Sequence, residues 1–269
     1  MILREGRVVY KKRFGRDLSA DPSKGDVIYR IASQTKSITS VAAMQLYERG
    51  KLLLNDPVSK YIPGFKDLRV LDKFDSRDSS YTTVKLKREL TILDLMTHTA
   101  GIEYGGAGSS ILSAIYEKNR LPSEIVDTRA FFKNEVLGKL LKLPLAHQPG
   151  EKSTYGYSTD ILGYLIEEIT GENLQDYFLN NIFKPLEMND TYFSIPEEKY
   201  RRLATIYTEN DKRKSVWWDY KSKVRVDFPL KKGIFFAGGE GVSTTTQDYA
   251  RFLQMLLHRG LYNGKRILN

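Results

Sequence analysis

The sequence predicts an α/β (α+β) fold in which a sheet-containing domain is split along the chain and carries a mostly helical insertion. Three observations lead to this class. Alternating apolar residues that predict strands occur near the start of the chain, at residues 2–14 and 27–30. Similar patterns return after Asp190. Between these ends, apolar residues recur at helical spacing in one segment after another.

The strand-rich ends and the helical middle set the expected domain bounds. We expect residues 1–54 and 200–269 to form the split sheet-containing domain and residues 55–199 to form the mostly helical one. No internal repeat is visible in the sequence.

The start of the chain combines a hairpin, a strand and a helix. Residues 2–14 alternate around Gly6, which predicts a β-hairpin, and residues 17–25 have the Ser, Asp, Pro and Gly content of a loop. The strand at residues 27–30 leads into an apolar-periodic run that predicts a helix. This helix should end at Gly50, because glycine readily adopts the left-handed conformation that follows a helix.

Helices dominate the middle of the chain. Asp56 and Pro57 predict a short helix that ends at Pro63, and Thr91 predicts the cap of a helix that runs to Met96. The polar and charged residues between them, 66–89, predict a surface excursion. Further helices are expected at residues 110–118, 128–142, 157–170 and 174–182, with Gly171 as another helix stop.

Strands and one long helix are expected after Asp190. Residues 191–194 and 203–208 predict strands, and the basic segment 212–225 predicts a solvated hairpin. A glycine-rich turn, Gly238-Gly239-Glu240-Gly241, comes before a last helix at about residues 245–258. The apolar stripe expected on that helix consists of Tyr249, Phe252, Leu253, Leu256 and Leu257.

Composition and charge narrow the class of protein. The 269 residues are 41% hydrophobic and 28% charged, which is ordinary for a globular protein and excludes disordered and fibrous classes. The absence of cysteine excludes disulfides and thiol catalysis. No apolar run is long enough to predict a membrane span and no signal peptide is recognisable, so the compartment stays open. The net charge of +9 and the basic, aromatic segment 212–225 leave nucleic-acid binding as an alternative, but the hairpin interpretation is favoured.

The strand-to-helix junction carries the candidate catalytic pair. Ser33 and Lys36 are three residues apart, so a helix places the lysine amine one turn along from the serine hydroxyl. A serine hydroxyl becomes a good nucleophile when a neighbour takes its proton, and a neutral lysine can do so. The helix N-terminus also favours an oxyanion that forms at an attacked carbonyl. The alternative is structural: Ser33 is then a helix N-cap and Lys36 a solvated residue of the first turn.

Several longer segments resemble one family. These segments are Arg30-Ile-Ala-Ser-Gln-Thr-Lys-Ser-Ile-Thr-Ser-Val-Ala-Ala-Met-Gln-Leu, Asn55-Asp-Pro-Val-Ser-Lys-Tyr-Ile-Pro, Leu90-Thr-Ile-Leu-Asp-Leu-Met-Thr-His-Thr-Ala-Gly-Ile, Phe183-Lys-Pro-Leu-Glu-Met and Gly241-Val-Ser-Thr-Thr-Thr-Gln-Asp-Tyr-Ala-Arg-Phe. Together they resemble the serine β-lactamase-related family, in its branch of class C β-lactamases, penicillin-binding DD-peptidases and lactamase-like carboxylesterases. The resemblance implies a β-lactamase/transpeptidase-like antiparallel sheet flanked by helices.

The resemblance also implies site residues. It makes Ser33 the nucleophile, Lys36 its base and Tyr155, after Gln148-Pro149-Gly150, the proton relay, with the Ser33 N–H as half of the oxyanion hole. Tyr157 then stands where lactamases have Asn, a departure that favours an esterase or peptidase, and we expect Tyr157, Gly239 and Gly241 to bind substrate. A rival placement puts the motif tyrosine at Tyr157, and Tyr155 is alternatively a core aromatic residue.

Other catalytic chemistries find less support. No G-x-S-x-G elbow presents a serine to His98, His147 or His258, so we interpret these three histidines as structural. No H-E-x-x-H or clustered metal-ligand spacing occurs, and the glycine-rich turn lacks the G-K-[ST] ending of a phosphate loop, so no metal or cofactor is implied.

The expected activity is acyl transfer through an acyl-enzyme on an ester, a D-amino-acid peptide or a β-lactam, with an esterase favoured. The alternatives are a catalytically silent penicillin-binding-like module that recognises peptidoglycan or a protein, and a nucleic-acid binder. The family's third motif, Lys-Thr-Gly or a relative of it, is missing before Asn269, and the helix usual ahead of the hairpin is missing too. We therefore expect a truncated sheet with an unpaired edge, little activity and self-association.

Overall fold

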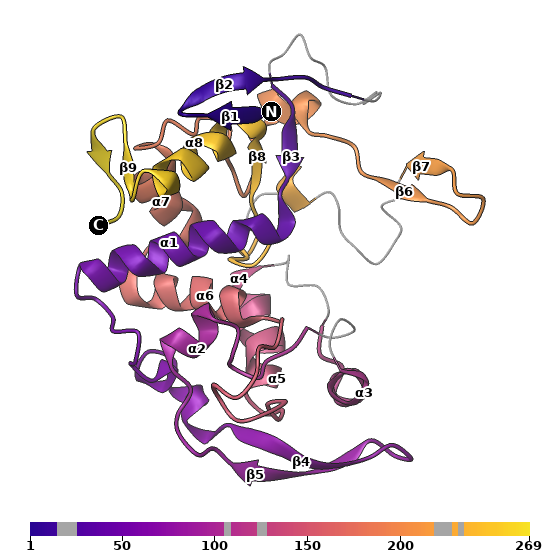
Figure 1. Cartoon of the computed structure of the whole chain (residues 1–269). Coiled ribbons are helices and arrows are strands. Elements are labelled where there is room, and N and C mark those ends of the chain that lie inside the picture. Colours follow the sequence, from indigo (N-terminus) through magenta and orange to yellow (C-terminus); the bar gives the residue numbers. More distant parts are fainter. Residues whose placement is uncertain (15–25, 105–108, 123–127, 218–227, 231–233) are drawn as a thin grey trace. The chain divides into compact units, whose positions relative to one another are not determined.

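The computed structural model describes residues 1–14, 26–104, 109–122, 128–217, 228–230 and 234–269 (Figure 1). The chain forms two compact units. The first contains Met1–Ser33, Gln175–Ile234 and Gly241–Asn269, and the second contains Gln34–Leu174 and Phe235–Glu240. The domain bounds expected from the sequence, 1–54 with 200–269 and 55–199, stay a prediction, because these units are not a test of them.

The first unit begins with the expected hairpin and strand. Strands β1 (Ile2–Arg4) and β2 (Arg7–Tyr10) pair in an antiparallel hairpin whose turn contains Gly6 at φ +75°. Strand β3 (Ile28–Arg30) pairs antiparallel with β8 (Ser243–Thr245), so segments more than 200 residues apart meet, with Ile28 opposite Thr245. Ile28 is buried with Ile195 and Leu203 in a small hydrophobic cluster.

Helices and short hairpins complete the first unit. They are α7 (Leu174–Phe178), the π-helical turn η6 (Leu179–Phe183), the 3₁₀ turns η7 (Glu197–Arg202) and η8 (Phe228–Leu230), the hairpin of β6 (Tyr207–Glu209) and β7 (Ser215–Trp217), the helix α8 (Thr246–Leu257), and the hairpin of β9 (Leu261–Tyr262) and β10 (Lys265–Arg266). The hairpin of β6 and β7 begins earlier than the expected basic hairpin at 212–225: only β7 lies in that segment, and β6 lies at the end of the strand expected at 203–208. Residues 218–225 of the expected hairpin lie outside the described residues.

Two sequence expectations in this unit are wrong. Residues 191–194 form no strand; Tyr192 makes a single bridge to Ser243. The expected apolar stripe of α8 is also shifted. Its buried apolar residues are Ala250, Phe252 and Met255, whereas Leu253 and Leu257 are 50% and 72% exposed. Helical periodicity located the helix correctly but assigned its buried face incorrectly.

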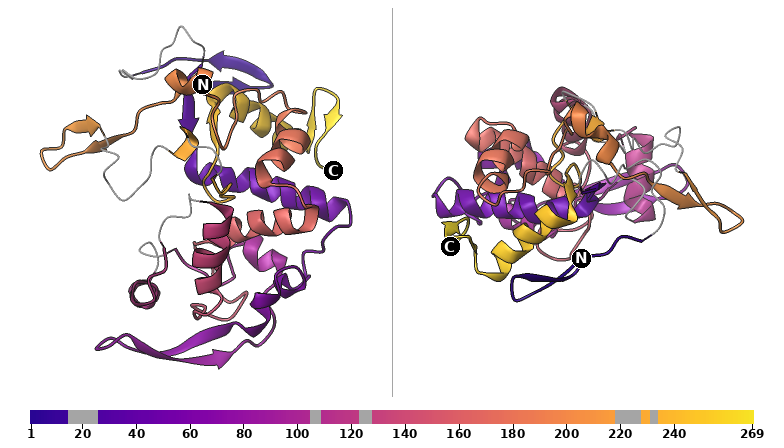
Figure 2. Two further views of the ribbon diagram at one scale, coloured as in Figure 1. Left: turned by 180° about the vertical axis from the view of Figure 1, so that it is seen from behind. Right: turned by 90° about the horizontal axis from the view of Figure 1, so that it is seen from above.

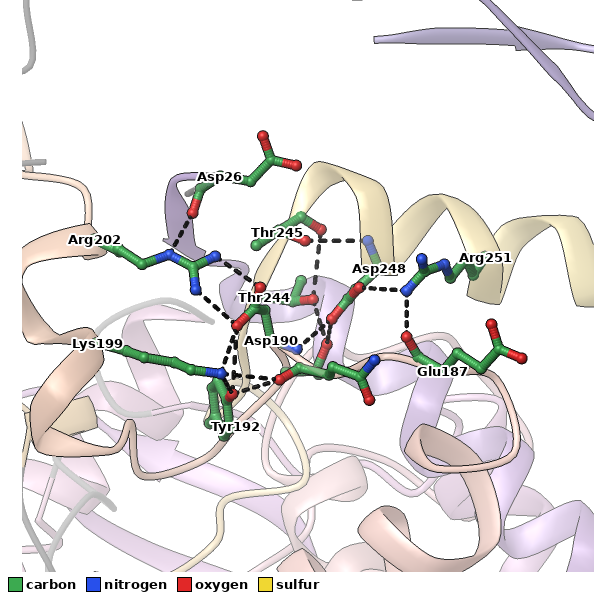
Figure 3. Close-up of polar contacts among 12 residues, drawn as sticks. Asp26, Glu187, Asp190, Tyr192, Lys199, Arg202, Thr244, Thr245, Asp248 and Arg251 are labelled. Atoms are coloured by element: carbon green, nitrogen blue, oxygen red, sulfur yellow. Dashed lines mark hydrogen bonds and ion pairs between the residues drawn. The ribbon is translucent and has the colours of Figure 1, made fainter. Parts of the chain in front are cut away.

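A polar cluster joins the start of α8 to residues 190–202 (Figure 3). Asp248, in the first turn of α8, accepts hydrogen bonds from the backbone N–H of Asp190 at 2.6 Å and from the Thr191 hydroxyl at 3.0 Å. Asp190 in turn accepts from Arg202 and Lys199. Carboxylates satisfied in this way fix a loop whose residues form no strand ladder.

The second unit is built around two helices that lie side by side, α1 (Thr35–Glu48) and α6 (Ser158–Thr170) (Figure 1). Both end as predicted, at Gly50 with φ +66° and at Gly171 with φ +71°. The other elements are the 3₁₀ turns η3 (Val58–Lys60) and η4 (Pro63–Asp67), the helices α2 (Ile92–Met96), α3 (Ser110–Lys118), α4 (Arg129–Phe131) and α5 (Gly138–Leu140), and the π-helical turn η5 (Phe132–Leu137) between the last two.

The predicted surface excursion is a long hairpin. Strands β4 (Arg69–Asp75) and β5 (Ser80–Lys85) pair antiparallel and project from the helices of the second unit, as the left view of Figure 2 shows. Only Val70 of the two strands is buried. The segment therefore lacks the alternation of apolar and polar residues that would have predicted strands from the sequence. Thr91 caps α2 as predicted, in a capping box with Asp94. Among the described residues, no helix has the length and apolar character needed to cross a bilayer.

Candidate active site

The predicted nucleophile stands at a local distortion of the backbone. Ser33 is exposed in the 3₁₀ turn η2 (Ala32–Gln34), which runs directly into α1. The N-cap of α1 is Gln34, so the alternative in which Ser33 is the N-cap is wrong. Ala32 has φ +43°, a strained value for a residue with a Cβ atom. Such strain persists where the surrounding structure enforces it, and functional sites are common places for it.

Lys36 lies in the first turn of α1 and points into the second unit. Its Nζ donates a hydrogen bond to the carbonyl oxygen of Gly239 at 2.8 Å. The same Nζ lies 4.8 Å from the ring centroid of Tyr155 and 5.7 Å from that of Tyr104. Lys36 is therefore not the solvated first-turn residue of the structural alternative, because its amine is held by one carbonyl and two aromatic rings.

Tyr155 and Tyr157 occupy different environments. Tyr155 is 50% exposed beside Lys36. Tyr157 is 1% exposed, its ring packs edge-on against Tyr104, and its hydroxyl donates to the carbonyl of Pro122 at 3.0 Å. These positions favour Tyr155 over the rival placement at Tyr157. Substrate binding by the buried Tyr157 side chain stays a prediction that its position does not support.

Gly156, between the two tyrosines, permits a close backbone approach. A Cβ atom on Gly156 would lie 2.1 Å from the carbonyl oxygen of Ile102 and 2.6 Å from the Cα of Glu103, distances that no real side chain tolerates. The absence of that atom lets residues 102–104 pack against residues 155–157. Tyr104 consequently reaches both tyrosine rings, with centroid distances of 5.5 Å to Tyr155 and 4.5 Å to Tyr157.

His98 is a site residue that the sequence reasoning interpreted as structural. Its ring stacks on Tyr155 with centroids 5.3 Å apart, and its Nε2 lies 3.2 Å from the Thr159 hydroxyl. Burial, together with the positive charge of Lys36, lowers the pKa of His98. A neutral imidazole at physiological pH is thus a packing surface for Tyr155. His147, by contrast, bonds to Thr154 and to the Gln148 carbonyl, and His258 to Gln254.

The glycine-rich turn supplies the carbonyl that Lys36 uses. Gly239 donates its N–H to Asp160 at 2.7 Å, and the preceding Gly238 accepts a hydrogen bond from Thr39 at 2.7 Å. Both polar backbone groups of Gly239 are therefore engaged by the protein, and substrate binding by this residue stays a prediction. Gly241, the third predicted substrate-binding residue, is buried and belongs to the first unit.

An acidic side chain adjoins this turn. Burial and the neighbouring Asp160 carboxyl raise the pKa of Glu240 to about 7, while the positive charge of Lys36 acts in the opposite direction. Glu240 therefore titrates in the physiological range beside Lys36. No group of three or more potential metal ligands was found among the residues that the structure describes.

Comparison with known proteins identifies the family of the chain. The family model described as Beta-lactamase matches residues 1–269. Protein Rv1367c of Mycobacterium tuberculosis is 35% identical over 255 residues, covering 94% of this chain and 60% of that protein. Esterase EstB of Burkholderia gladioli is 28% identical over 277 residues, covering 95% of this chain and 64% of that protein. The chain thus spans about 60% of the length of these relatives.

A solved structure confirms the fold class. The unliganded simvastatin synthase LovD from Aspergillus terreus superposes with a TM-score of 0.74 at 25% identity, over 93% of this chain and 59% of that one. The predicted β-lactamase/transpeptidase-like fold of helices and sheets is therefore correct. With a family model that matches from the first residue to the last, the chain belongs to the Beta-lactamase family.

Proposed function

We propose that the chain is a serine hydrolase of the acyl-transferring kind, with an ester as the favoured substrate. The observation that carries the proposal is the placement of Lys36, whose Nζ is held between the Gly239 carbonyl and the Tyr155 ring, one helical turn after Ser33. An amine fixed in this way is positioned to exchange protons with a nearby hydroxyl. One of the similar proteins, EstB, is an esterase by name, which agrees with an ester substrate.

In the proposed reaction, Ser33 Oγ attacks the substrate carbonyl and loses its proton to Lys36, which acts as the base in its neutral form, with Tyr155 as the relay. The negative charge on the carbonyl oxygen forms beside the N–H of Ser33, at the amino end of α1, where the helix dipole favours it. Collapse of the tetrahedral intermediate expels the alcohol, which takes up a proton from the Lys36–Tyr155 pair. Water, or another alcohol, then attacks the acyl-enzyme by the same steps in reverse.

Tyr155 suits the relay better than its two neighbours. Burial, followed by the Asp160 carboxyl, raises the pKa of Tyr104, so that phenol stays protonated. The Tyr157 hydroxyl is used by Pro122. Tyr155 alone of these three is exposed, so a substrate or leaving group can reach it.

Covalent labelling tests the proposal. A fluorescent alkyl phosphonate should label the wild-type chain and leave Ser33→Ala unlabelled. Ser37→Ala, a change in the same helical turn at a hydroxyl that donates to the Gln34 carbonyl, should label normally. Lys36→Ala and Tyr155→Phe should label slowly and hydrolyse p-nitrophenyl acetate at less than about one-hundredth of the wild-type rate. Labelling of Ser33→Ala at the wild-type level would overturn the assignment of the nucleophile.

The same gel separates the proposal from its alternatives. A fluorescent penicillin that labels Ser33 in place of the phosphonate would indicate a β-lactam or D-amino-acid peptide substrate. A folded wild-type chain that takes up neither probe would contradict the hydrolase and favour the catalytically silent binding module.

A further inference from the structure

A buried carboxyl group connects the two sides of the candidate site. Asp160 lies in the first turn of α6 and is fully buried. Its Oδ1 accepts the Gly239 N–H at 2.7 Å and its Oδ2 accepts the Tyr104 hydroxyl at 2.8 Å. The two partners come from segments 79 and 56 residues away along the chain. A carboxyl group buried this completely is retained at a large desolvation cost, which its partners must offset.

The first arm of this connection leads to Lys36. The peptide between Gly238 and Gly239 is held at both ends, because Thr39 donates to its carbonyl and Asp160 accepts from its N–H. The next carbonyl along, that of Gly239, is the one that binds Lys36 Nζ. Asp160 therefore determines where the acceptor of Lys36 lies.

Gly238 and Gly239 pack closely against residues of α6. A Cβ atom on Gly239 would lie 2.5 Å from Asp160 Oδ2 and 2.6 Å from Oδ1. A Cβ atom on Gly238 would lie 2.7 Å from the carbonyl oxygen of Thr159. The glycine pair is thus pressed directly against the first turn of α6, and a carboxyl of the size and position of Asp160 fits against it.

The second arm leads to Tyr155. The hydroxyl bond to Asp160 fixes the Tyr104 ring, which contacts the Tyr155 ring edge-on and lies within 5.7 Å of Lys36 Nζ. The His98 ring also stacks on the Tyr155 ring. Because Tyr104 stays protonated, it acts as a donor to Asp160 and as a wall for Tyr155.

We infer that Asp160 is the positioning residue of this site, which fixes Lys36 through Gly239 and Tyr155 through Tyr104. The inference rests on the proposed function, since the two groups that it positions are the proposed base and relay. The carboxyl also lies at the amino end of a 13-residue helix, where the helix dipole acts in favour of its ionised form. Burial raises the pKa of Asp160, and the Tyr104 hydroxyl, the charge of Lys36 and the Gly239 N–H act against that rise.

Two variants separate the arms. Asp160→Asn keeps the size and an acceptor for Gly239 but replaces the carboxyl oxygen that accepts from Tyr104 with an amide group. Tyr104→Phe removes only the hydroxyl bond. Asp94→Asn is the matched control: Asp94 is also a buried carboxyl of the second unit, but it binds Arg88 and the cap of α2.

The first readout does not need activity. The nitrogen-15 NMR signal of Lys36 Nζ, identified by its loss in Lys36→Arg, should shift in Asp160→Asn and stay in place in Asp94→Asn. In the hydrolysis of p-nitrophenyl acetate, kcat of Asp160→Asn should fall by on the order of tenfold to a hundredfold with little change in KM, as expected when catalytic groups are displaced slightly. Its pH profile should move as well, whereas Asp94→Asn should lose thermal stability and keep its profile.

The outcomes remain distinguishable from failure of the proposed function. A wild-type chain without phosphonate labelling overturns the hydrolase, while an unchanged Lys36 signal in Asp160→Asn overturns the positioning role whatever the labelling shows. If Asp160→Asn does not fold, Tyr104→Phe decides: a changed ring signal of Tyr155 supports the role, and an unchanged one overturns it.

Discussion

Arg202 donates two hydrogen bonds to Asp190, from Nη1 to Oδ1 at 2.9 Å and from Nη2 to Oδ2 at 2.7 Å (Figure 3). The guanidinium is almost fully buried, its Nε donates to the Asp26 carbonyl, and Lys199 adds a third donor to Asp190. The pair therefore joins η7 to the ends of two other segments of the first unit, near residues 26 and 190.

This pair should contribute measurably to stability. Arg202→Met leaves Asp190 part-buried without its bidentate partner, and we expect the free energy of unfolding in urea to fall by on the order of 3 kcal/mol. Lys60→Met is the control, because Lys60 pairs with Asp56 but its side chain is 54% exposed, and such an exposed pair contributes little to stability. Equal losses in the two variants would contradict the importance of the buried pair.

The same pair should make stability depend on pH. Burial acts to raise the pKa of Asp190, but the hydrogen bonds from Arg202 and Lys199 outweigh it and hold the pKa below its ordinary value. A lowered pKa means that the stabilisation is present above the unfolded-state pKa, about 3.9, and is lost as the pH falls below it. Urea unfolding from pH 7 down to pH 3 should show this loss in the wild type and a smaller one in Asp190→Asn.

Gly239 should not tolerate a methyl group. In Gly239→Ala the new Cβ would meet the Asp160 carboxyl, so the turn must shift and carry the acceptor of Lys36 with it. We expect a loss of ester hydrolysis of about a hundredfold. Gly50→Ala is the control: it meets nothing within 4 Å but has φ +66°, so it should cost about 1 kcal/mol of stability and leave activity unchanged. An active Gly239→Ala enzyme would show that the turn can move without consequence.

The sequence was informative where a feature depends on neighbouring residues. Gly50, Thr91 and Gly171 mark helix ends in the structure as predicted, because capping uses residues within a turn of each other. The face that α8 buries could not be obtained in this way. Leu253 and Leu257 have the apolar character of core residues, and only the packing of the unit decides that Met255 is buried in their place.

The residues of the candidate site differ in the same way: some could be predicted from neighbouring residues and others could not. Ser33 and Lys36 were visible as a local spacing, and the structure gives Lys36 a buried acceptor. Asp160 and Tyr104 were not identified, because their roles arise from pairing across 56 residues. The one available signal was a carboxyl directly before the apolar run 161–166 of α6, where a charged residue that becomes buried needs a partner.

Glu240 should lower stability at neutral pH. Its pKa of about 7, raised by burial and by Asp160, exceeds the unfolded-state value. The protonated side chain is tolerated in the folded chain, so no stability is lost below about pH 4. Stability is lost as the pH rises through 7, because the buried carboxyl then ionises. Burial, Asp160 and Lys36 set the pKa of Glu240, and Glu240 in turn raises the pKa of the neighbouring Tyr104. Glu240→Gln should therefore be more stable than the wild type above pH 7, by about 3 kcal/mol, and equal to it near pH 4. A difference that is independent of pH in thermal unfolding would contradict the assignment.

The apolar side chains of α8 should promote self-association. Leu253 and Leu257 are 50% and 72% exposed, and Leu256 beside them is 40% exposed. The β1–β2 hairpin of the same unit exposes Val8 and Val9, and exposed apolar groups of this kind are typical of surfaces that bind another protein. The double variant Leu253→Glu, Leu257→Lys should reduce the fraction of dimers and larger species in sedimentation velocity, while unfolding changes by less than about 1 kcal/mol because neither side chain is buried. Phe252→Ala, on the buried face of the same helix, should instead cost about 3 to 5 kcal/mol. A wild-type chain that stays monomeric at concentrations on the order of 100 μM, well above those at which weak dimers form, would show that this surface does not bind a second copy.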